Sequence, residues 1–314
     1  MHQAAGTFAI LRLESRNEPL SAVSAGDQGR VLLPGVARRT DMRISDLSLI
    51  SLALLAFTLS LAGCGDSSTP TISVGGIAWG FTLPGQGGYD RIANATISVL
   101  EMPELSTTSN TDGEFTIAGI PVGSEATFVL EQPSYPLTYT KTFTIPDTDI
   151  DNLTFQIPNK GLYSVIEIQL GITSDPEKCQ MVSTFTRVGR TIGDPGPHGQ
   201  AGAVLTIAPA NAVFEEGPIY FGDNVVPDRS RTYSSLDGGV LIVNADPGDY
   251  TLTAACVTDP DQKAALLAEY PPADFPDEDL RCETENVPFE TVMMKCRAGV
   301  FLNASPSYGL QALP

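Results

Sequence analysis

The chain has 314 residues, of which 42% are hydrophobic, so it is long enough for two domains with buried cores. Its 37 Asp and Glu outnumber its 18 Lys and Arg, and the net charge of −19 disfavours nucleic-acid binding because an acidic surface repels phosphate backbones. Its 29 Gly and 24 Pro break it into short segments rich in Thr, Val, Ile and Tyr, a pattern typical of all-β domains.

The N-terminal region divides into two predicted parts. Residues 1–41 carry scattered Arg and show no strong hydrophobic period, so we expect them to be an extension ahead of a natural start at Met42. The apolar run Leu47–Gly63 follows the positive charge of Arg43. It is 17 residues long, shorter than the about 20 of a spanning helix, and predicts a signal peptide over 42–63.

The run ends in Leu61-Ala62-Gly63-Cys64, which resembles the lipobox of bacterial lipoproteins. The resemblance implies that the signal peptide is cut before Cys64, and that its thiol carries a diacylglyceryl group. Further acyl chains, such as palmitate, make such an anchor stable. Gly65 rather than Asp follows Cys64, which implies the outer membrane. The alternative is an uncleaved signal anchor with an incidental Cys.

The predicted mature chain starts at Cys64 and has 251 residues. It keeps 12 basic and 32 acidic side chains, a net charge of −20. Such a surface favours solubility, and the alternative is attraction of Ca²⁺ or a basic partner. Residues 64–71 are small and polar, and are predicted to form a flexible tether.

Alternating residues and turn signals predict a β-domain over 72–158, the first repeat. Its strands are expected at Ala95–Glu101, Phe115–Ile120, Ala126–Glu131, Lys141–Ile145 and Leu153–Ile157. Turns containing Gly separate these strands because Gly accepts positive φ.

Three motifs of the first repeat resemble the carboxypeptidase regulatory-like family. They are Ala95-Thr96-Ile97, Thr111-Asp112-Gly113-Glu114-Phe115 and Pro121-Val122-Gly123. The resemblance implies a transthyretin-like β-sandwich, in a group of folds that includes carbohydrate-binding-like domains. The motifs are those of β-hairpins, so the resemblance implies a fold and no activity.

A second copy of the pattern is predicted over 161–304, the second repeat. Ala203–Ile207 corresponds to the first strand of the pattern, and Asp237-Gly238 to its Asp-Gly turn. Asp237 and Gly248 are 11 positions apart, the spacing found between the ends of Asp112–Gly123. The predicted fold is therefore all-β, with two β-sandwich domains behind a signal peptide and a tether.

Other elements of the second half are expected as follows. Tyr163–Leu170 and Met181–Val188 are predicted to be extra strands of the second repeat, with Gly193–Gln200 as an internal loop. A single stretch, Asp261–Tyr270, has the pattern of a helix. Residues 305–314 are a C-terminal tail.

Four Cys remain beside Cys64, and an even number in an exported chain predicts two disulfides. Three pairings are possible. We prefer Cys256–Cys282, which encloses the predicted helix, and Cys179–Cys296, which joins an early strand to the last one. Free buried thiols are the alternative. A metal site at these Cys is not expected, because no Cys-x-x-Cys or paired His accompanies them.

Few residues suit catalysis. Of the two His, His2 lies in the doubtful extension and His198 in a Gly/Pro loop, and the common nucleophile, zinc, phosphate and dinucleotide motifs are absent from the sequence. No enzyme activity and no cofactor are therefore expected. The alternative is a pair of carboxylates that meet in space, as in a hydrolase.

Asp147, Asp149 and Asp151 form a weak metal candidate, because they have the spacing of the first ligands of an EF-hand-type Ca²⁺ loop. Pro158 takes the position of the final bidentate Glu, so the pattern is incomplete. A polar loop between two strands is the preferred interpretation.

Aromatic residues supply the ligand candidates. Trp79, Phe81 and Tyr89 are a possible platform for stacking a sugar ring, although a lone Trp in a β-sandwich is more often part of the core. The rival patch is Tyr220, Phe221 and Tyr233. Exposed rings favour sugar binding, and buried rings favour a scaffold.

The expected function is a membrane-anchored, non-catalytic structural or adaptor module at the cell envelope. Its partners are the membrane, through the lipid, and an envelope protein. The alternative is a carbohydrate-binding envelope lipoprotein whose partner is a glycan, and a carboxylate-based hydrolase is the third hypothesis.

Overall fold

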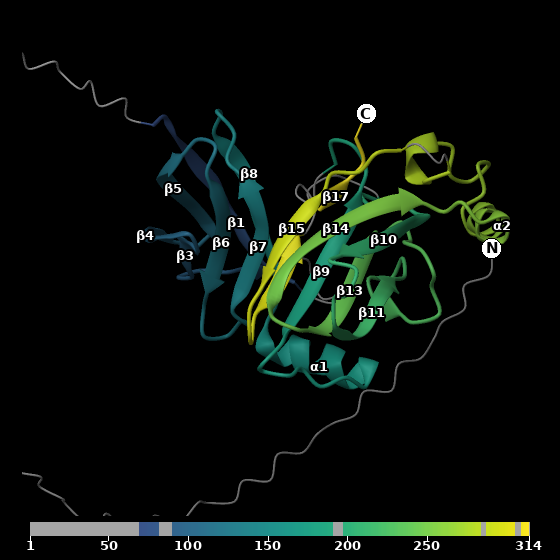
Figure 1. Cartoon of the computed structure of the whole chain (residues 1–314), viewed down its shortest axis with the longest axis horizontal. Helices are drawn as coiled ribbons and strands as arrows, with labels where there is room; N and C mark the ends of the chain where they lie inside the picture. The colour runs from purple at the N-terminus through teal and green to yellow at the C-terminus, as the bar shows by residue number, and fades with distance from the viewer. Residues whose placement is uncertain (1–68, 82–89, 191–196, 284–286, 305–308, 314) are drawn as a thin grey trace, which may run out of the picture. The chain divides into compact units, whose positions relative to one another are not determined.

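The computed structural model describes residues 69–81, 90–190, 197–283, 287–304 and 309–313. They belong to one compact unit, Gly65–Pro314. This unit is mostly β-sheet in open, sandwich-like layers (Figure 1), which confirms the all-β prediction. No helix in the described part of the chain is long and apolar enough to span a bilayer.

The first repeat forms two β layers. It contains β1 Thr71–Phe81, β2 Asp90–Arg91, β3 Thr96–Val99, β4 Met102–Thr108, β5 Glu114–Pro121, β6 Glu125–Glu131, β7 Thr138–Thr144 and β8 Ile150–Pro158. In one layer β1 pairs antiparallel with β5 and parallel with β8. In the other, β4, β3, β6 and β7 pair in that order, and the two layers enclose one apolar cluster. All five predicted strands are confirmed.

The second repeat reproduces these pairings. It contains β9 Cys179–Thr186, β10 Ala203–Ala208, β11 Phe214–Phe221, β12 Pro227–Asp228, β13 Gly239–Ala245, β14 Gly248–Cys256, β15 Val292–Cys296 and β16 Phe301–Ala304, followed by β17 Leu310–Gln311. Here β9 pairs antiparallel with β13 and parallel with β16, while β10, β14 and β15 pair in order. Gly238 before β13 has φ +77°, and Gly113 before β5 has φ +72°. The strand pairings of this part of the chain thus parallel those of the first part.

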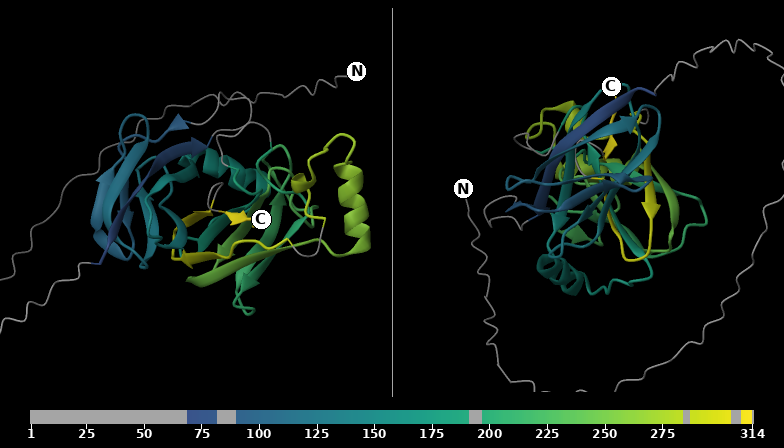
Figure 2. Two further views of the ribbon diagram at one scale, coloured as in Figure 1. Left: turned by 90° about the horizontal axis from the view of Figure 1, so that it is seen from above. Right: turned by 90° about the vertical axis from the view of Figure 1, so that its left-hand side faces the viewer.

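The two repeats share a sheet through β7. Besides pairing with β6, its Thr142 pairs with Met293 of β15, and its Thr138 and Tyr139 pair with β16. β7 therefore connects the two layers of the second repeat, and 13 strands among the described residues form one continuous sheet. Figure 2 shows the C-terminal strands, in yellow, between the blue strands of the first repeat and the green strands of the second.

The strand predicted at Tyr163–Leu170 is wrong, because this segment lies in α1, Lys160–Leu170. Its alternation fits a strand, but its apolar residues also recur at helical spacing and pack on β13. The capping residues favour the helix. The Asn159 side chain accepts a hydrogen bond from the Leu162 N–H, and Gly171 ends α1 at φ +63°, in the left-handed region.

Two further predictions for this half agree with the structure, but residues 305–314 are not only a tail, since β17 pairs parallel with β9. Most of the loop predicted at Gly193–Gln200 lies outside the described residues. The strand expected at Met181–Val188 is β9, and the helix expected at Asp261–Tyr270 is α2, Pro260–Glu269. The Asp259 carboxylate caps α2 by accepting hydrogen bonds from two N–H groups of its first turn. A short 3-10 helix, η1 at Glu278–Leu280, completes the insertion between β14 and β15.

Both preferred disulfides are present. Cys179 at the start of β9 is bonded to Cys296 at the end of β15, with Cα atoms 5.7 Å apart. Cys256 at the end of β14 is bonded to Cys282 just after η1, with Cα atoms 4.9 Å apart. The first bond ties the two layers of the second repeat together, and the second closes the segment that holds α2.

Candidate functional site

The predicted lipid-anchor residues lie outside the described part of the chain. These are Leu61, Ala62, Gly63 and Cys64. The description starts at Thr69, two residues before β1. The anchor therefore stays a prediction from the sequence, and the structure shows only where the chain enters the body.

The predicted aromatic platform is described in part. Trp79 and Phe81 lie at the end of β1 and are half-buried, while Tyr89 lies outside the described residues. Arg91 of β2 stacks on Trp79, with its guanidinium carbon 3.6 Å from the ring centroid. One face of the Trp79 ring is therefore covered by a cation from its own chain, which leaves at most the other face for a ligand.

The rival aromatic patch is mostly buried, which favours a scaffold over sugar binding at these residues. Tyr220 and Tyr233 are 2% and 8% exposed, and Phe221 is half-buried. The Tyr220 hydroxyl accepts a hydrogen bond from the Leu205 N–H and lies in the core of the second repeat. A buried ring with a hydrogen-bonded hydroxyl stabilises the fold and offers no face to a sugar.

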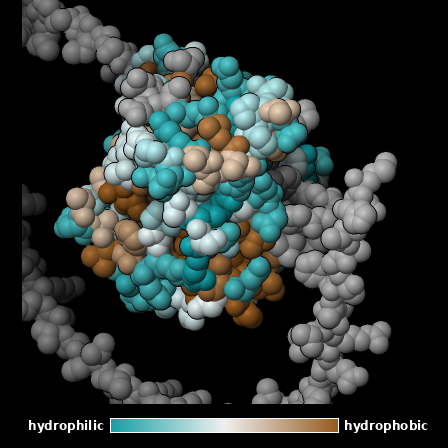
Figure 3. All heavy atoms as spheres, turned by 90° about the vertical axis from the view of Figure 1, so that its right-hand side faces the viewer, coloured by the Kyte–Doolittle hydropathy of each residue, from teal (hydrophilic) through white to brown (hydrophobic). Residues whose placement is uncertain are grey.

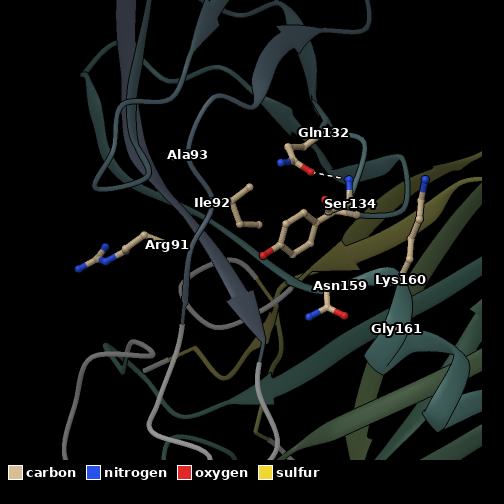
Figure 4. Close-up of a pocket in the computed structure, with 9 residues that line it drawn as sticks. Arg91, Ile92, Ala93, Gln132, Ser134, Asn159, Lys160 and Gly161 are labelled. Atoms are coloured by element: carbon tan, nitrogen blue, oxygen red, sulfur yellow. Dashed lines mark hydrogen bonds between the residues drawn. The ribbon is translucent and has the colours of Figure 1, made fainter. Parts of the chain in front are cut away.

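A hollow of about 610 Å³ lies where β2 faces the start of α1. Polar side chains predominate in its lining. The lining residues are Arg91, Ile92, Ala93, Gln132, Ser134, Tyr135, Asn159, Lys160 and Gly161. Figure 4 shows Arg91 and Lys160 on opposite sides of the hollow, with their charged ends pointing apart. The Gln132 amide oxygen accepts a hydrogen bond from the Ser134 N–H at 2.6 Å, and Asn159 caps α1.

This arrangement suits a polar, uncharged ligand better than an anion. Amide and hydroxyl groups line the hollow, whereas its two cations do not converge on one point. The hollow was not predicted, because the segment Tyr163–Leu170 was expected to be a strand and no helix was expected to start beside β2. The signal was the Asn159 cap together with Gly171, spaced as the two ends of a three-turn helix.

A pair of carboxylates lies under the insertion that carries α2. Asp237 accepts a hydrogen bond from the Gly239 N–H at 3.1 Å, and Asp223 accepts one from the Tyr270 hydroxyl at 2.9 Å and another from the Leu236 N–H at 3.0 Å. Burial, with the nearby Asp223 charge, raises the pKa of Asp237 to about 6, against the hydrogen bond from Gly239. These hydrogen bonds hold a turn and the end of α2 in place.

The three acids at the start of β8 do not gather around one point. Asp147, Asp149 and Asp151 are exposed, and Asp149 accepts a hydrogen bond from the Ser73 N–H at 2.8 Å. Among the residues that the structure describes, no group of three or more His, Cys, Asp and Glu is placed to hold a metal ion. His198 is half-buried, and its carbonyl accepts a hydrogen bond from the Arg187 N–H.

Comparison with known proteins gives only distant likenesses. No protein-family model and no curated protein matches the chain. The Bacillus anthracis TIE protein is 10% identical with a TM-score of 0.23, over 78% of this chain and 34% of its own. The shaft pilin spaA from Lactobacillus rhamnosus GG is 12% identical with a TM-score of 0.21, over 78% of this chain and all of its own. Scores this low carry no argument about function.

Proposed function

We propose that this chain is an exported lipoprotein, fixed to a membrane through Cys64, that acts as a non-catalytic structural or adaptor module of the cell envelope. The observation that carries the proposal is the shared sheet, in which β7 of the first repeat pairs with two strands of the second. Two sandwiches joined in this way form a stiff body, and a stiff body on an anchor suits holding or spacing partners.

Charged contacts across the two repeats support the same conclusion. Lys295 of β15 forms ion pairs with Glu101 at 2.6 Å and Glu125 at 3.0 Å, both in the first repeat. Burial raises the pKa of Glu101, but hydrogen bonds from Lys295 and Thr127 outweigh it and hold that pKa below its ordinary value. Lys141 of β7 pairs with Glu290 at 3.3 Å. These contacts oppose a hinge between the repeats.

The disulfides support export. All four Cys after Cys64 are paired in two bonds, and such bonds persist in oxidising compartments outside the cytosol. Together with the lipobox resemblance, this favours a body on the outer side of the inner membrane. Gly65 after the anchor favours the outer membrane as its location. We also propose that both repeats are transthyretin-like, since their matched strand pairings repeat one sandwich pattern.

The anchor is tested by replacing Cys64 with Ser in the full chain. The variant should lose labelled palmitate and move from the membrane to the soluble fraction, because Ser lacks the thiol that accepts the lipid. Ser67→Ala, three residues along the same tether, is the matched control and should keep both properties. A Cys64→Ser protein that still takes up palmitate and sediments with membranes would overturn the proposal.

A second candidate function is carbohydrate binding at the hollow beside α1. The polar lining favours it, because amide and hydroxyl groups such as those of Gln132, Ser134 and Asn159 are the usual partners of sugar hydroxyls. A glycan array should then give a signal that Gln132→Ala abolishes and that Gln169→Ala, at an exposed position on the far part of α1, leaves unchanged. A blank array removes this candidate and leaves the structural one.

A further inference from the structure

We infer that the outer edge of β5 in the first repeat is a strand-addition site, where an extended, basic segment of a partner protein pairs with residues 114–118. The inference rests on the proposed adaptor role, to which it assigns the chemistry of a partner. β5 and its counterpart in the second repeat, β13, differ in what lies along this edge.

The two strands occupy equivalent places in their repeats. β13 follows Gly238 and pairs antiparallel with β9, just as β5 follows Gly113 and pairs antiparallel with β1. The outer edge of β13 is occupied by β11, whose Ile219 pairs with Leu241. Leu241 is buried in an apolar cluster that includes residues of α1. In the second repeat, the edge of this layer is therefore completed by the chain itself.

β5 has no such neighbour among the described residues. Its ladder partner there is β1, and Figure 1 shows β5 at the outer edge of its layer. The Ala78 N–H donates to the Gly113 carbonyl, so the alternation of an antiparallel ladder turns the N–H and C=O groups of Thr116 and Ala118 away from β1. Both residues are exposed. β5 thus presents a template for one further strand.

The preceding strand of each repeat explains the difference. β4 corresponds to β11 in chain order, but it pairs with β3 of the opposite layer, whereas β11 pairs with β13. The position that β11 fills beside β13 is therefore left open beside β5. The half-buried Leu105 of β4 lies across this position, 4.0 Å from where a Cβ atom would lie at Gly119. Side chains that an added strand directs inwards therefore meet an apolar neighbour.

Charge selects a basic partner. The first repeat carries ten acidic side chains and two basic ones. Both cations are already engaged, Arg91 with the Trp79 ring and Lys141 with Glu290. Glu114 lies exposed at the start of β5. The outward side chains of an added strand lie in a field that favours Lys and Arg, so the partner segment alternates apolar and basic residues, with the period of a strand.

The side of the body that carries α2 offers a different kind of surface. Figure 3 shows its apolar side chains in separate patches among hydrophilic ones, which is normal for a protein surface. Unpaired strand edges, in contrast, are usually short, covered or broken by a bulge. β5 has its bulge at Gly119, where φ is +85°, and stays regular over 114–118. The regular part is long enough for a partner strand.

The test uses a fluorescein-labelled peptide that alternates Val and Lys and matches β5 in length. Fluorescence polarisation should show saturable binding to the full, lipid-anchored chain in detergent. An otherwise identical peptide with an N-methylated backbone keeps the charge but cannot complete the ladder, and it should bind at least about ten-fold more weakly. A peptide that alternates Val and Glu should not bind.

Hydrogen exchange locates the bound peptide. Exchange at the Thr116 and Ala118 amides should slow, while exchange in β13, whose edge is already paired, stays as it was. Ala118→Pro removes one outward N–H and leaves the ladder to β1 intact, so it should weaken binding at least about ten-fold. Ala118→Ser keeps that N–H and is the matched control. Circular dichroism checks that both variants are folded.

The contrary outcomes separate the two proposals. Equal binding of the N-methylated peptide, or protection outside β5, overturns strand addition, because charge alone then explains the binding. Equal binding of the Val–Glu peptide overturns the choice of a basic partner. A palmitate-labelled chain that binds none of the peptides overturns the inference and leaves the anchor standing. A chain that takes up no palmitate but binds as expected overturns the anchor and leaves the strand-addition site standing.

Discussion

The two repeats share one strand pattern but are stabilised in different ways. The first contains no Cys and encloses a compact apolar cluster with short connections. The second holds both disulfides, α2 and η1, and its two layers are bridged by a strand from its neighbour. Both repeats therefore enclose a buried apolar cluster, and the second adds covalent bonds that shorten the loops its long insertions would leave in the unfolded chain.

The largest expected effect comes from removing the bond that spans the second repeat. Cys179→Ser with Cys296→Ser should lower the free energy of unfolding by about 5 kcal/mol, because this bond closes a long loop of the unfolded chain. Removing Cys256–Cys282, which closes a short loop, should cost about 3.5 kcal/mol. Urea unfolding followed by circular dichroism measures both. If removing Cys179–Cys296 lowers the free energy of unfolding by less than removing Cys256–Cys282, loop length does not determine how much each disulfide stabilises the fold.

The next effect tests whether the first repeat is stable by packing alone. Phe128 is fully buried and stacks edge-on against Phe143, so Phe128→Ala should cost about 3–5 kcal/mol. Because β7 joins the repeats, we expect one unfolding transition for the whole body. Fluorescence of Trp79, the single Trp, reports the first repeat, and circular dichroism reports both. If the unfolding midpoint from Trp79 fluorescence differs from the midpoint from circular dichroism in this variant, the shared strand does not couple the unfolding of the two repeats.

The equivalent Asp-Gly turns provide a pH test. The folded pKa of Asp237 is raised to about 6, above its unfolded value, so the folded state binds the extra proton between these values. Stability should therefore fall as pH rises through this window, towards about 6, and stay lower above it. Asp237→Asn should raise the melting temperature at pH 7.5 and change it little at pH 3.5.

The matched control is Asp112→Asn, at the corresponding exposed turn of the first repeat. It should change the melting temperature little at either pH, because its carboxylate is solvated in both states. An Asp237→Asn chain with the pH profile of the parent would show that the carboxylate under α2 is not destabilising.

The smallest expected effect concerns α1, which has no counterpart in the first repeat. Asn159→Ala removes the side chain that accepts the Leu162 N–H and should cost about 1 kcal/mol. Hydrogen exchange at the first turn of α1 should quicken while exchange in β1 stays as it was. Lys160→Ala, at the exposed next position, keeps the cap and is the control. If hydrogen exchange in the first turn of α1 is equally fast in both variants, the Asn159 cap does not stabilise the start of this helix.

The sequence by itself determined much of this protein. Alternation and Gly turns located the strands of the first repeat, the 11-residue spacing predicted a second copy, and the Cys count predicted two disulfides, because each of these depends on local chemistry or on simple counting. Only the tertiary structure decided the rest. The Tyr163–Leu170 segment fits two periods, and packing on β13 selected the helix. The bridging role of β7, the hollow beside α1 and the Asp223–Asp237 pair unite residues far apart in the chain, whose meeting no local pattern encodes.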